Sequence, residues 1–371
     1  MADKSKIAWC DSTINPCMGC SPVSPACDNC YAARMTHRLA ANIKIPPYFF
    51  GLTDAGGKWT GRINLHAHLM KQVLRWQKPR RIFVGSMTDL FHENVPDEFL
   101  DQVFAYVALA PRHTFLILTK RPKRMRRYFT RFSRRHHTQV LERAAMAMFG
   151  EDAANAVGNA LDEVLAEGHN VGWPMRNLWL GITAEDQQRA DERIPILLDT
   201  PAAKRFVSIE PMLGAIDLRP WLPGPCQHPQ CDGGSIPVGN DGGRPCPWCE
   251  CGPLDRLDWV ICGGESGPNA RPMHPDWARS LRDQCAQAGV PYLFKQWGEW
   301  MPCSAMDDEE EAPGGAPWGY IGDDGIFDPG EDGVFSCRNG VKDEQTFRVG
   351  KHRAGRLLDG VEHNAFPEVR P

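Results

Sequence analysis

The stretch Thr114-Phe115-Leu116-Ile117-Leu118 is a near-continuous run of aliphatic, aromatic and β-branched residues. Apolar runs of this length are typical of strands that are buried on both faces of a parallel sheet. Five further runs have the same character, and they lie at 81–84, 178–182, 205–209, 259–262 and 292–294. We therefore expect at least six buried strands.

Helical patterns lie between these runs. One set of apolar residues recurs at intervals of three and four and comprises Phe99, Leu100, Val103, Phe104 and Val107. A second set, Trp277, Leu281 and Cys285, predicts a helix that ends at Gly289. Strands that alternate with helices predict an α/β chain, and this number of units favours a partial (β/α)6-type TIM barrel over a doubly wound sheet.

The predicted barrel spans residues 1–300 and is interrupted three times. The interruptions are a loop insertion near 42–65, a helical excursion at 131–174 and a Cys-rich segment at 223–253. Residues 301–371 follow as a C-terminal extension.

Composition limits the classes of protein that this chain can belong to. The 371 residues carry 42 Lys+Arg against 46 Asp+Glu, a net charge of -4, which excludes a strongly basic nucleic-acid coat protein. No apolar run of membrane-spanning length occurs, and no apolar segment follows the N-terminus, so we expect a cytoplasmic protein with no membrane partner. In such a compartment, 14 cysteines point to metal sites or reactive thiols rather than disulfides.

The N-terminal cysteines allow two kinds of metal site. Cys20-x6-Cys27-x2-Cys30 can supply three thiolates from one loop, which would leave one iron of a [4Fe-4S] cluster open to an outside ligand. If Cys17 joins them, the pairs Cys17-x2-Cys20 and Cys27-x2-Cys30 make a closed four-thiolate site of the zinc or rubredoxin type. Spacing alone leaves both alternatives open.

Polar residues follow nearly every predicted strand. In a parallel barrel these positions meet at the carboxyl-end rim, where active sites are built from several strands. Each could instead be a helix cap or part of a local salt bridge. The candidates are Ser86, Thr88, Asp89, Lys120, Glu185, Glu210, Glu265, Lys295 and Trp297.

The second cysteine group predicts a structural metal. Cys226-x4-Cys231 and Cys246-x2-Cys249 form two ligand pairs, as in a zinc ribbon or knuckle. Because the surrounding segment has few apolar residues, a metal would replace a hydrophobic core. We expect Zn²⁺ here, with an auxiliary iron-sulfur cluster as the alternative.

A basic stretch from 112 to 141 contains no Asp or Glu and has aromatic residues between its Lys and Arg residues. Arg124, Arg127, Arg131 and Arg134 recur at helical spacing, which predicts one helix face that contacts the phosphates of a nucleic acid. The alternative is a solvated helix face that is balanced by the acidic residues of 151–167.

Several longer motifs carry a family resemblance. They are Asn15-Pro16-Cys17-Met18-Gly19-Cys20, Ser24-Pro25-Ala26-Cys27-Asp28-Asn29-Cys30-Tyr31-Ala32, and the segments 86–92, 118–122, 208–214, 263–267, 294–298 and 354–360. Together they resemble a phage-associated family with a three-cysteine motif, long left as a domain of unknown function and regarded as radical-S-adenosylmethionine-like (radical SAM). The first cysteine gap is longer than that of ordinary radical SAM enzymes, but the number of thiolates is the same.

The resemblance implies roles for individual residues. Cys20, Cys27 and Cys30 would bind the [4Fe-4S] cluster, while Cys17 lies outside the family signature. The residues expected to hold S-adenosyl-L-methionine are Tyr31, Ser86, Thr88, Asp89, Lys120, Glu185 and Glu210. Those expected to face the substrate are Glu265, Lys295 and Trp297.

The resemblance also implies an activity. We expect a radical SAM enzyme, encoded by a phage or its bacterial host, that generates a 5′-deoxyadenosyl radical and modifies or rearranges a nucleic-acid base. DNA is favoured over RNA, with hypermodified thymine of phage DNA as one candidate and with isomerase, transferase and lyase outcomes all open. Its partners would be the nucleic acid and an electron donor such as a flavodoxin or ferredoxin. The alternatives are a peptide or protein substrate, and a zinc-binding nucleic-acid adaptor without catalysis.

Overall fold

The computed structural model describes residues 4–42, 44, 47–166, 175–223, 235–237, 243–245, 256–306, 316–330 and 342–368. The chain divides into two compact units. Unit 1 comprises Met1–Thr183 with Thr200–Lys204, and unit 2 comprises Ala184–Asp199 with Arg205–Pro371.

Unit 1 contains four parallel strands. They are β1 (Ser12–Ile14), β4 (Arg81–Val84), β5 (Thr114–Thr119) and β6 (Leu178–Thr183), which are hydrogen-bonded in that order. Ile82, Val84, Leu116 and Ile117 are fully buried, as expected for strands that are covered on both faces. A short antiparallel pair, β2 (Cys17–Met18) and β3 (Asn64–Leu65), follows the end of β1.

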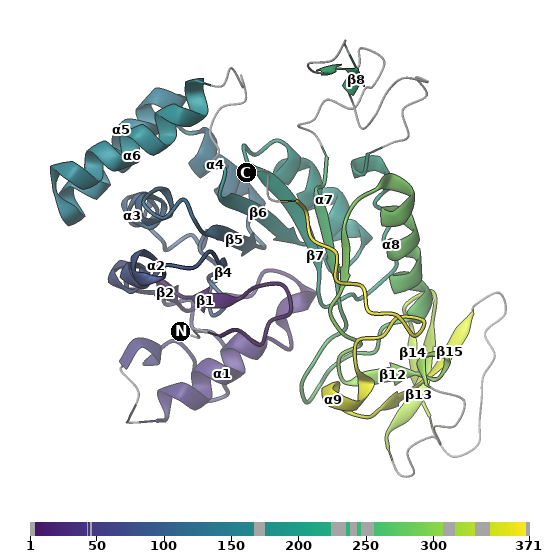
Figure 1. Cartoon of the computed structure of the whole chain (residues 1–371). Helices are drawn as coiled ribbons and strands as arrows, with labels where there is room; N and C mark the ends of the chain where they lie inside the picture. The colour runs from purple at the N-terminus through teal and green to yellow at the C-terminus, as the bar shows by residue number, and fades with distance from the viewer. Residues whose placement is uncertain are drawn as a thin grey trace. The chain divides into compact units, whose positions relative to one another are not determined.

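The helices of unit 1 follow the apolar periodicity. They are α1 (Tyr31–Ala40), α2 (Lys71–Arg75), α3 (Asp97–Ala108), α4 (Pro122–Thr130), α5 (Arg134–Phe149) and α6 (Glu151–Ala166), with 3-10 turns η1 (Pro25–Cys27), η2 (Pro47–Phe49) and η3 (Ala67–Met70). Phe104 of α3 stacks on Tyr128 of α4 with 5.2 Å between ring centroids. Helices α5 and α6 lie side by side and are separated by Gly150, whose φ of 90° ends α5 (Figure 1).

Unit 2 contains three parallel strands, β7 (Lys204–Ile209), β10 (Trp259–Cys262) and β11 (Tyr292–Phe294). Its helices are α7 (Gln187–Leu198), α8 (Pro275–Ala288) and the short α9 (Lys351–Ala354), with turns η4 (Arg219–Trp221) and η5 (Cys303–Ala305). A second sheet is antiparallel in the order β12 (Trp300–Pro302), β15 (Asp343–Arg348), β13 (Trp318–Gly322) and β14 (Phe327–Pro329). Strands β8 (Ser235–Pro237) and β9 (Gly243–Pro245) form a separate pair.

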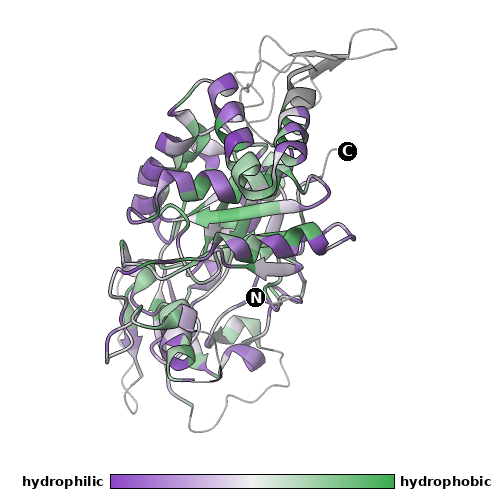
Figure 2. Ribbon diagram, turned by 90° about the vertical axis from the view of Figure 1, so that its left-hand side faces the viewer, coloured by the Kyte–Doolittle hydropathy of each residue, from purple (hydrophilic) through white to green (hydrophobic). Residues whose placement is uncertain are grey.

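The α/β class and all six predicted strands are confirmed. Helix α8 ends as expected, because Gly289 has a left-handed φ of 65°. Figure 2 shows helices that carry both hydrophilic and hydrophobic residues. The strand drawn as an arrow at the centre of the view is hydrophobic along most of its length. The sequence patterns missed β1, because Ser12 and Thr13, two of its three residues, are polar. The expected boundary near residue 300 stays a prediction.

No helix in the described part of the chain is both long enough and apolar enough to cross a membrane.

The C-terminal segment covers the free edge of β11. Phe294 N donates to His363 O at 2.9 Å, and Ala365 N donates to Tyr292 O at 3.2 Å. Trp259 Nε1 donates to Ala365 O at 2.9 Å, and its ring lies 5.0 Å from that of Phe366. This pairing protects an edge strand that would otherwise offer unpaired N–H and C=O groups.

We expect a chain that stops at Glu362 to be less stable by about 3 kcal/mol, because it loses these three hydrogen bonds and the Phe366 contact. Denaturant unfolding followed by tryptophan fluorescence would measure the change. A chain that stops at Glu368 is the control and should unfold like the full chain. Equal stability of all three chains would contradict the role given to this segment.

Candidate functional site

The cysteine loop of unit 1, residues 15–30, begins where β1 ends. Cys27 is the last residue of η1, and Cys30 is the N-cap of α1. Cys30 N donates to Cys27 O at 3.3 Å, so the two residues share one turn. Cys20, Cys27 and Cys30 are half-buried, whereas Cys17 is fully buried.

Burial controls the protonation of the Cys20 and Cys17 thiols. Burial, followed by the charge of Asp89 and a smaller effect of Cys27, raises the pKa of Cys20 to about 12, although Arg121 acts in the opposite direction. Burial also raises the pKa of Cys17 to about 12, against a weak contact with Thr88 Oγ1 at 3.6 Å. In the metal-free protein both groups are therefore neutral thiols, and binding of a metal would release their protons.

Arg121 links the cysteine loop to the end of β5. Its Nη1 donates to Asp89 Oδ2 at 3.0 Å and contacts Cys20 Sγ at 3.8 Å. Its Nη2 donates to the carbonyl oxygen of Ser21 at 3.0 Å and to Ser21 Oγ at 2.8 Å. Its Nε donates to both carboxylate oxygens of Glu93. The sequence motif 118–122 contains Arg121, but the patterns directed attention to its neighbour Lys120.

The Asp89 carboxylate accepts four hydrogen bonds from residues of unit 1. Its oxygens accept from Phe91 N, Thr119 Oγ1, Lys120 N and Arg121 Nη1, at 3.0, 2.7, 3.1 and 3.0 Å. Four donors match the ordinary capacity of a carboxylate. We therefore assign Asp89 to holding Arg121 and the strand end, rather than to a direct contact with a cofactor amine.

The other predicted cofactor residues of unit 1 surround the same loop. Thr88 Oγ1 donates to Gly19 O at 2.7 Å, and the Tyr31 hydroxyl donates to Ser86 O. Ser86 Oγ bonds to the side chain of Asn15, whose Oδ1 also accepts from Met87 N at 2.8 Å. Asn15 was not among the predicted site residues, although it is the first residue of the cysteine motif. The backbone amide of Lys120 is used by Asp89.

In unit 2, two predicted acidic residues are buried in ion pairs. Glu185 Oε2 lies 3.1 Å from Arg193 Nη1, and both side chains are almost inaccessible. The Glu265 carboxylate accepts from the Arg271 backbone N and Nε, both at 2.9 Å, and from Arg271 Nη2 at 2.6 Å. These contacts give both carboxylates structural partners.

Lys295 and Glu210 form an ion pair after β11 and β7, and their side chains remain 17% and 20% exposed. Burial lowers the pKa of Lys351, and the charge of Lys295 lowers it further. The two ammonium groups are therefore close to each other. Trp297, by contrast, is committed to packing: its ring is 4.9 Å from that of Phe294, and its Nε1 donates to Leu357 O at 2.8 Å. Among the predicted substrate residues, Lys295 is thus the accessible one.

Of the two glycines after β10, Gly264 allows the backbone to approach that of Trp297 closely. A Cβ added to Gly264 would lie 1.8 Å from Trp297 O, while the closest contact for one added to Gly263 would be 3.4 Å from Lys295 Cβ. The amide of Gly264 already donates to Gln296 O at 2.9 Å. This turn is therefore packed closely against residues 296–297 and is not an open phosphate-binding loop.

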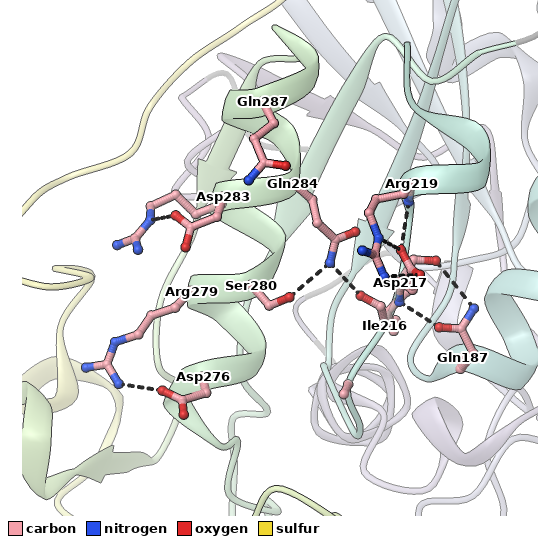
Figure 3. A pocket seen from close by; sticks show the side chains of 12 residues that line it. Gln187, Ile216, Asp217, Arg219, Asp276, Arg279, Ser280, Asp283, Gln284 and Gln287 are labelled. Atoms are coloured by element: carbon pink, nitrogen blue, oxygen red, sulfur yellow. Dashed lines mark hydrogen bonds and ion pairs between the residues drawn. The ribbon is translucent and has the colours of Figure 1, made fainter. Parts of the chain in front are cut away.

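A surface depression of about 780 Å³ lies in unit 2 against α8 and the loop 215–219 (Figure 3). Gln284 Nε2 donates to Ile216 O at 3.1 Å, and its Oε1 accepts from Leu218 N at 2.7 Å. Gln187 Oε1 accepts from Asp217 N at 2.6 Å. These groups hold the loop against the helices, and none of the predicted site residues lines the depression.

Within the described residues, no three His, Cys, Asp or Glu side chains are grouped in a way that could hold a metal ion. The chemistry of the cysteine loop still fits an iron-sulfur cluster, because it offers three half-buried thiols, with Cys27 close enough to Cys20 to raise its pKa. The buried guanidinium of Arg121 suits a negatively charged group. Cys226, Cys231, Cys246 and Cys249 lie outside the described residues.

The basic stretch differs from its prediction. Helix α4 ends at Thr130 and α5 begins at Arg134, so the prediction that the four arginines share one helix face is wrong. Arg124 pairs with Asp97, and Arg131 pairs with Asp97 and Asp101.

The side chains of Arg124 and Arg131 are only 9% and 14% exposed. Burial raises the pKa of Asp97, but hydrogen bonds from the two arginines outweigh this and keep it below its usual value. Both arginines therefore tie α4 and the following turn to α3. Arg127 is exposed, and the side chain of Arg134 lies outside the described part of the structure.

Comparison with known proteins identifies the family. The family described as "Protein of unknown function (DUF5131)" matches residues 4–367. The chain belongs to the DUF5131 family. No curated protein and no solved structure matches it. The DUF5131 match includes both the cysteine loop and the Lys295–Glu210 pair.

The close approach at Gly264 predicts that alanine is more destabilising there than at the adjacent Gly263. Gly264→Ala should lower the free energy of unfolding by about 2 kcal/mol or more, because the backbone must shift to admit the methyl group. Gly263→Ala meets only ordinary contacts and serves as the matched control. Urea unfolding would compare them, and equal stability of the two variants would contradict the packing described here.

Proposed function

We propose that this DUF5131 protein is a radical SAM enzyme in which Cys20, Cys27 and Cys30 hold a [4Fe-4S] cluster. The observation that carries the proposal is the contrast among the four cysteines. Cys20, Cys27 and Cys30 are half-buried on one loop, and Cys20 contacts a buried guanidinium, while Cys17 is fully buried and contacts Thr88. This contrast supports a three-thiolate site over a closed four-thiolate site.

We further propose that the parallel strands belong to a partial (β/α)6-type barrel of the radical SAM kind. The alternation of parallel strands with helices in each unit supports this. The predicted phage-associated family and the Zn²⁺ knuckle at 223–253 remain part of the proposal.

The chemistry that such a cluster supplies when bound is one-electron reduction of S-adenosyl-L-methionine, the source of a 5′-deoxyadenosyl radical. The side chains of the protein bind, orient and neutralise charge. In unit 1, Arg121 and Asp89 hold the cysteine loop, and Tyr31, Ser86 and Thr88 add the further hydrogen bonds described above. In unit 2, the ammonium group of Lys295 could donate to an anionic group while Glu210 holds it in place.

We propose a nucleic-acid base as the substrate, with DNA favoured over RNA and a flavodoxin or ferredoxin as electron donor. The supporting feature is an exposed basic surface on α4 and α5 that was not the predicted one. It comprises Lys123, Arg126 and Arg127 of α4 and Arg135 of α5, which are all exposed, and the turn between the two helices adds Phe132, which is 40% exposed. Cationic side chains with an exposed aromatic ring suit phosphate contact and base stacking.

Cysteine substitution tests the cluster. After anaerobic reconstitution the protein should contain about four irons at this site. Cys20→Ala, Cys27→Ala and Cys30→Ala should each abolish iron and acid-labile sulfide, whereas Cys17→Ala is the matched control and should retain both. If Cys17→Ala loses as much iron as the others, the closed four-thiolate adaptor replaces the enzyme as the better hypothesis.

The two sets of arginines should behave in opposite ways. Replacing Arg126, Arg127 and Arg135 by Gln should weaken DNA binding and reduce its dependence on salt by roughly one unit of slope per lost contact, with little change in stability. Replacing the buried Arg124 and Arg131 by Gln should instead lower the free energy of unfolding by about 2 kcal/mol or more, because Asp97 and Asp101 lose their ion-pair partners.

Fluorescence anisotropy at several salt concentrations and chemical denaturation would measure the two effects. Absence of any binding by the unaltered protein to DNA or RNA at low salt would remove the nucleic-acid substrate. A peptide or protein substrate would then be the leading alternative.

A further inference from the structure

Arg121 is the most completely hydrogen-bonded side chain beside the cysteine loop. A guanidinium has five N–H groups in a rigid plane, and here the two terminal nitrogens and Nε contact Asp89, Cys20, Ser21 and Glu93. The residue is only 6% exposed. Such a side chain cannot reorient without breaking several contacts at once.

The guanidinium is held from the strand side independently of the loop. Thr119 Oγ1 donates to Asp89 Oδ1 at 2.7 Å and accepts from Arg121 N at 2.9 Å. The end of β5 thus fixes both members of the ion pair between Asp89 and Arg121. A pair anchored in this way offers a rigid surface to the more irregular loop.

Ser21, the residue directly after Cys20, is held on both its backbone and its side chain. Arg121 Nη2 donates to its carbonyl oxygen and to its Oγ, and His92 Nε2 lies 2.8 Å from the same Oγ. Asn94 N donates to His92 Nδ1 at 3.1 Å, so the neutral ring carries its proton on Nε2 and donates to Ser21. Two donors from two different segments therefore hold the start of the loop.

The charge of Arg121 also has a direct effect at the sulfur. Nη1 lies 3.8 Å from Cys20 Sγ in a poorly solvated region, where Coulomb interactions are stronger than in water. A donor to a ligating sulfur and a nearby positive charge both favour the reduced, more negative state of an iron-sulfur cluster. Without the guanidinium, the buried carboxylate of Asp89 would act on the same sulfur without compensation.

We infer that Arg121 is a positioning residue that locks the loop at Cys20 and Ser21 and raises the reduction potential of whatever cluster the loop holds. Its effect on the potential rests on the proposed function, whereas its effect on the loop does not. Glu93 completes the guanidinium's contacts from the solvent side, where it is 64% exposed.

The experiment uses the full chain with three substitutions. Arg121→Gln removes the charge and the planar set of N–H donors. Arg121→Lys keeps the charge, but its single ammonium group cannot donate to all of the same acceptors. Glu93→Gln is the matched control, because it alters a contact of the same guanidinium on the side away from the loop. Hydrogen exchange of backbone amides in 20–30 is measured on the metal-free protein, and the potential by redox titration of the reconstituted protein with electron paramagnetic resonance.

We expect amide exchange in 20–30 to be at least about tenfold faster in both Arg121 variants and unchanged in Glu93→Gln. Arg121→Gln should shift the reduction equilibrium about tenfold against the reduced cluster, which is ~59 mV toward negative potential for one electron. Arg121→Lys should retain most of the potential of the unaltered protein. This separation of loop order from potential is what a merely structural arginine would not produce.

Several results would overturn the inference. Exchange in 20–30 that is unchanged in both Arg121 variants rejects the locking of the loop, whether or not a cluster binds. An unchanged potential in a loaded Arg121→Gln protein rejects the electrostatic effect. If Arg121→Gln accelerates exchange throughout β4 and β5, it has lost the fold, and Arg121→Lys then decides. If the unaltered protein binds no iron, the proposed function fails, while the exchange measurement still tests the lock.

Discussion

A guanidinium and a carboxylate lie buried against each other at the end of β5, with Arg121 Nη1 3.0 Å from Asp89 Oδ2. Neither charge could stay in so poorly solvated a place alone, because an unpaired buried ion costs several kcal/mol. Their pairing lets one rigid group contact the strand end, the segment of His92 and Glu93, and the cysteine loop together. The order of the candidate site in unit 1 depends on this pair.

The same constraint explains why several predicted ligands have structural roles. A carboxylate inside the protein needs donors, and Glu185 and Glu265 obtain theirs from Arg193 and Arg271. The accessible exception is Glu210 with Lys295, where partial exposure leaves room for another group. Burial, rather than residue type, therefore separates candidate ligands from the framework that supports them.

The basic stretch shows how one composition can serve two purposes. Arg124 and Arg131 face α3 and neutralise Asp97 and Asp101, whereas Arg127 and its exposed neighbours face solvent. A turn between α4 and α5 interrupts the helical spacing on which the predicted face relied. Charge spacing in a sequence does not reveal this, because the partners come from a helix that ends before the stretch begins.

The amino-acid sequence by itself determined the α/β class, the six apolar strands and the end of α8, because apolar runs and a glycine at a helix end are local signals. Cysteine spacing left a three-thiolate and a four-thiolate site open, and the family resemblance of the motifs favoured Cys20, Cys27 and Cys30. Only the tertiary structure decided that Cys17 is fully buried while the other three are half-buried, and that Arg121, not Lys120, reaches the loop. The antiparallel pairing of residues 363–365 with β11 was equally absent from the sequence patterns. These features depend on contacts between segments far apart in the chain, for which local patterns carry no information.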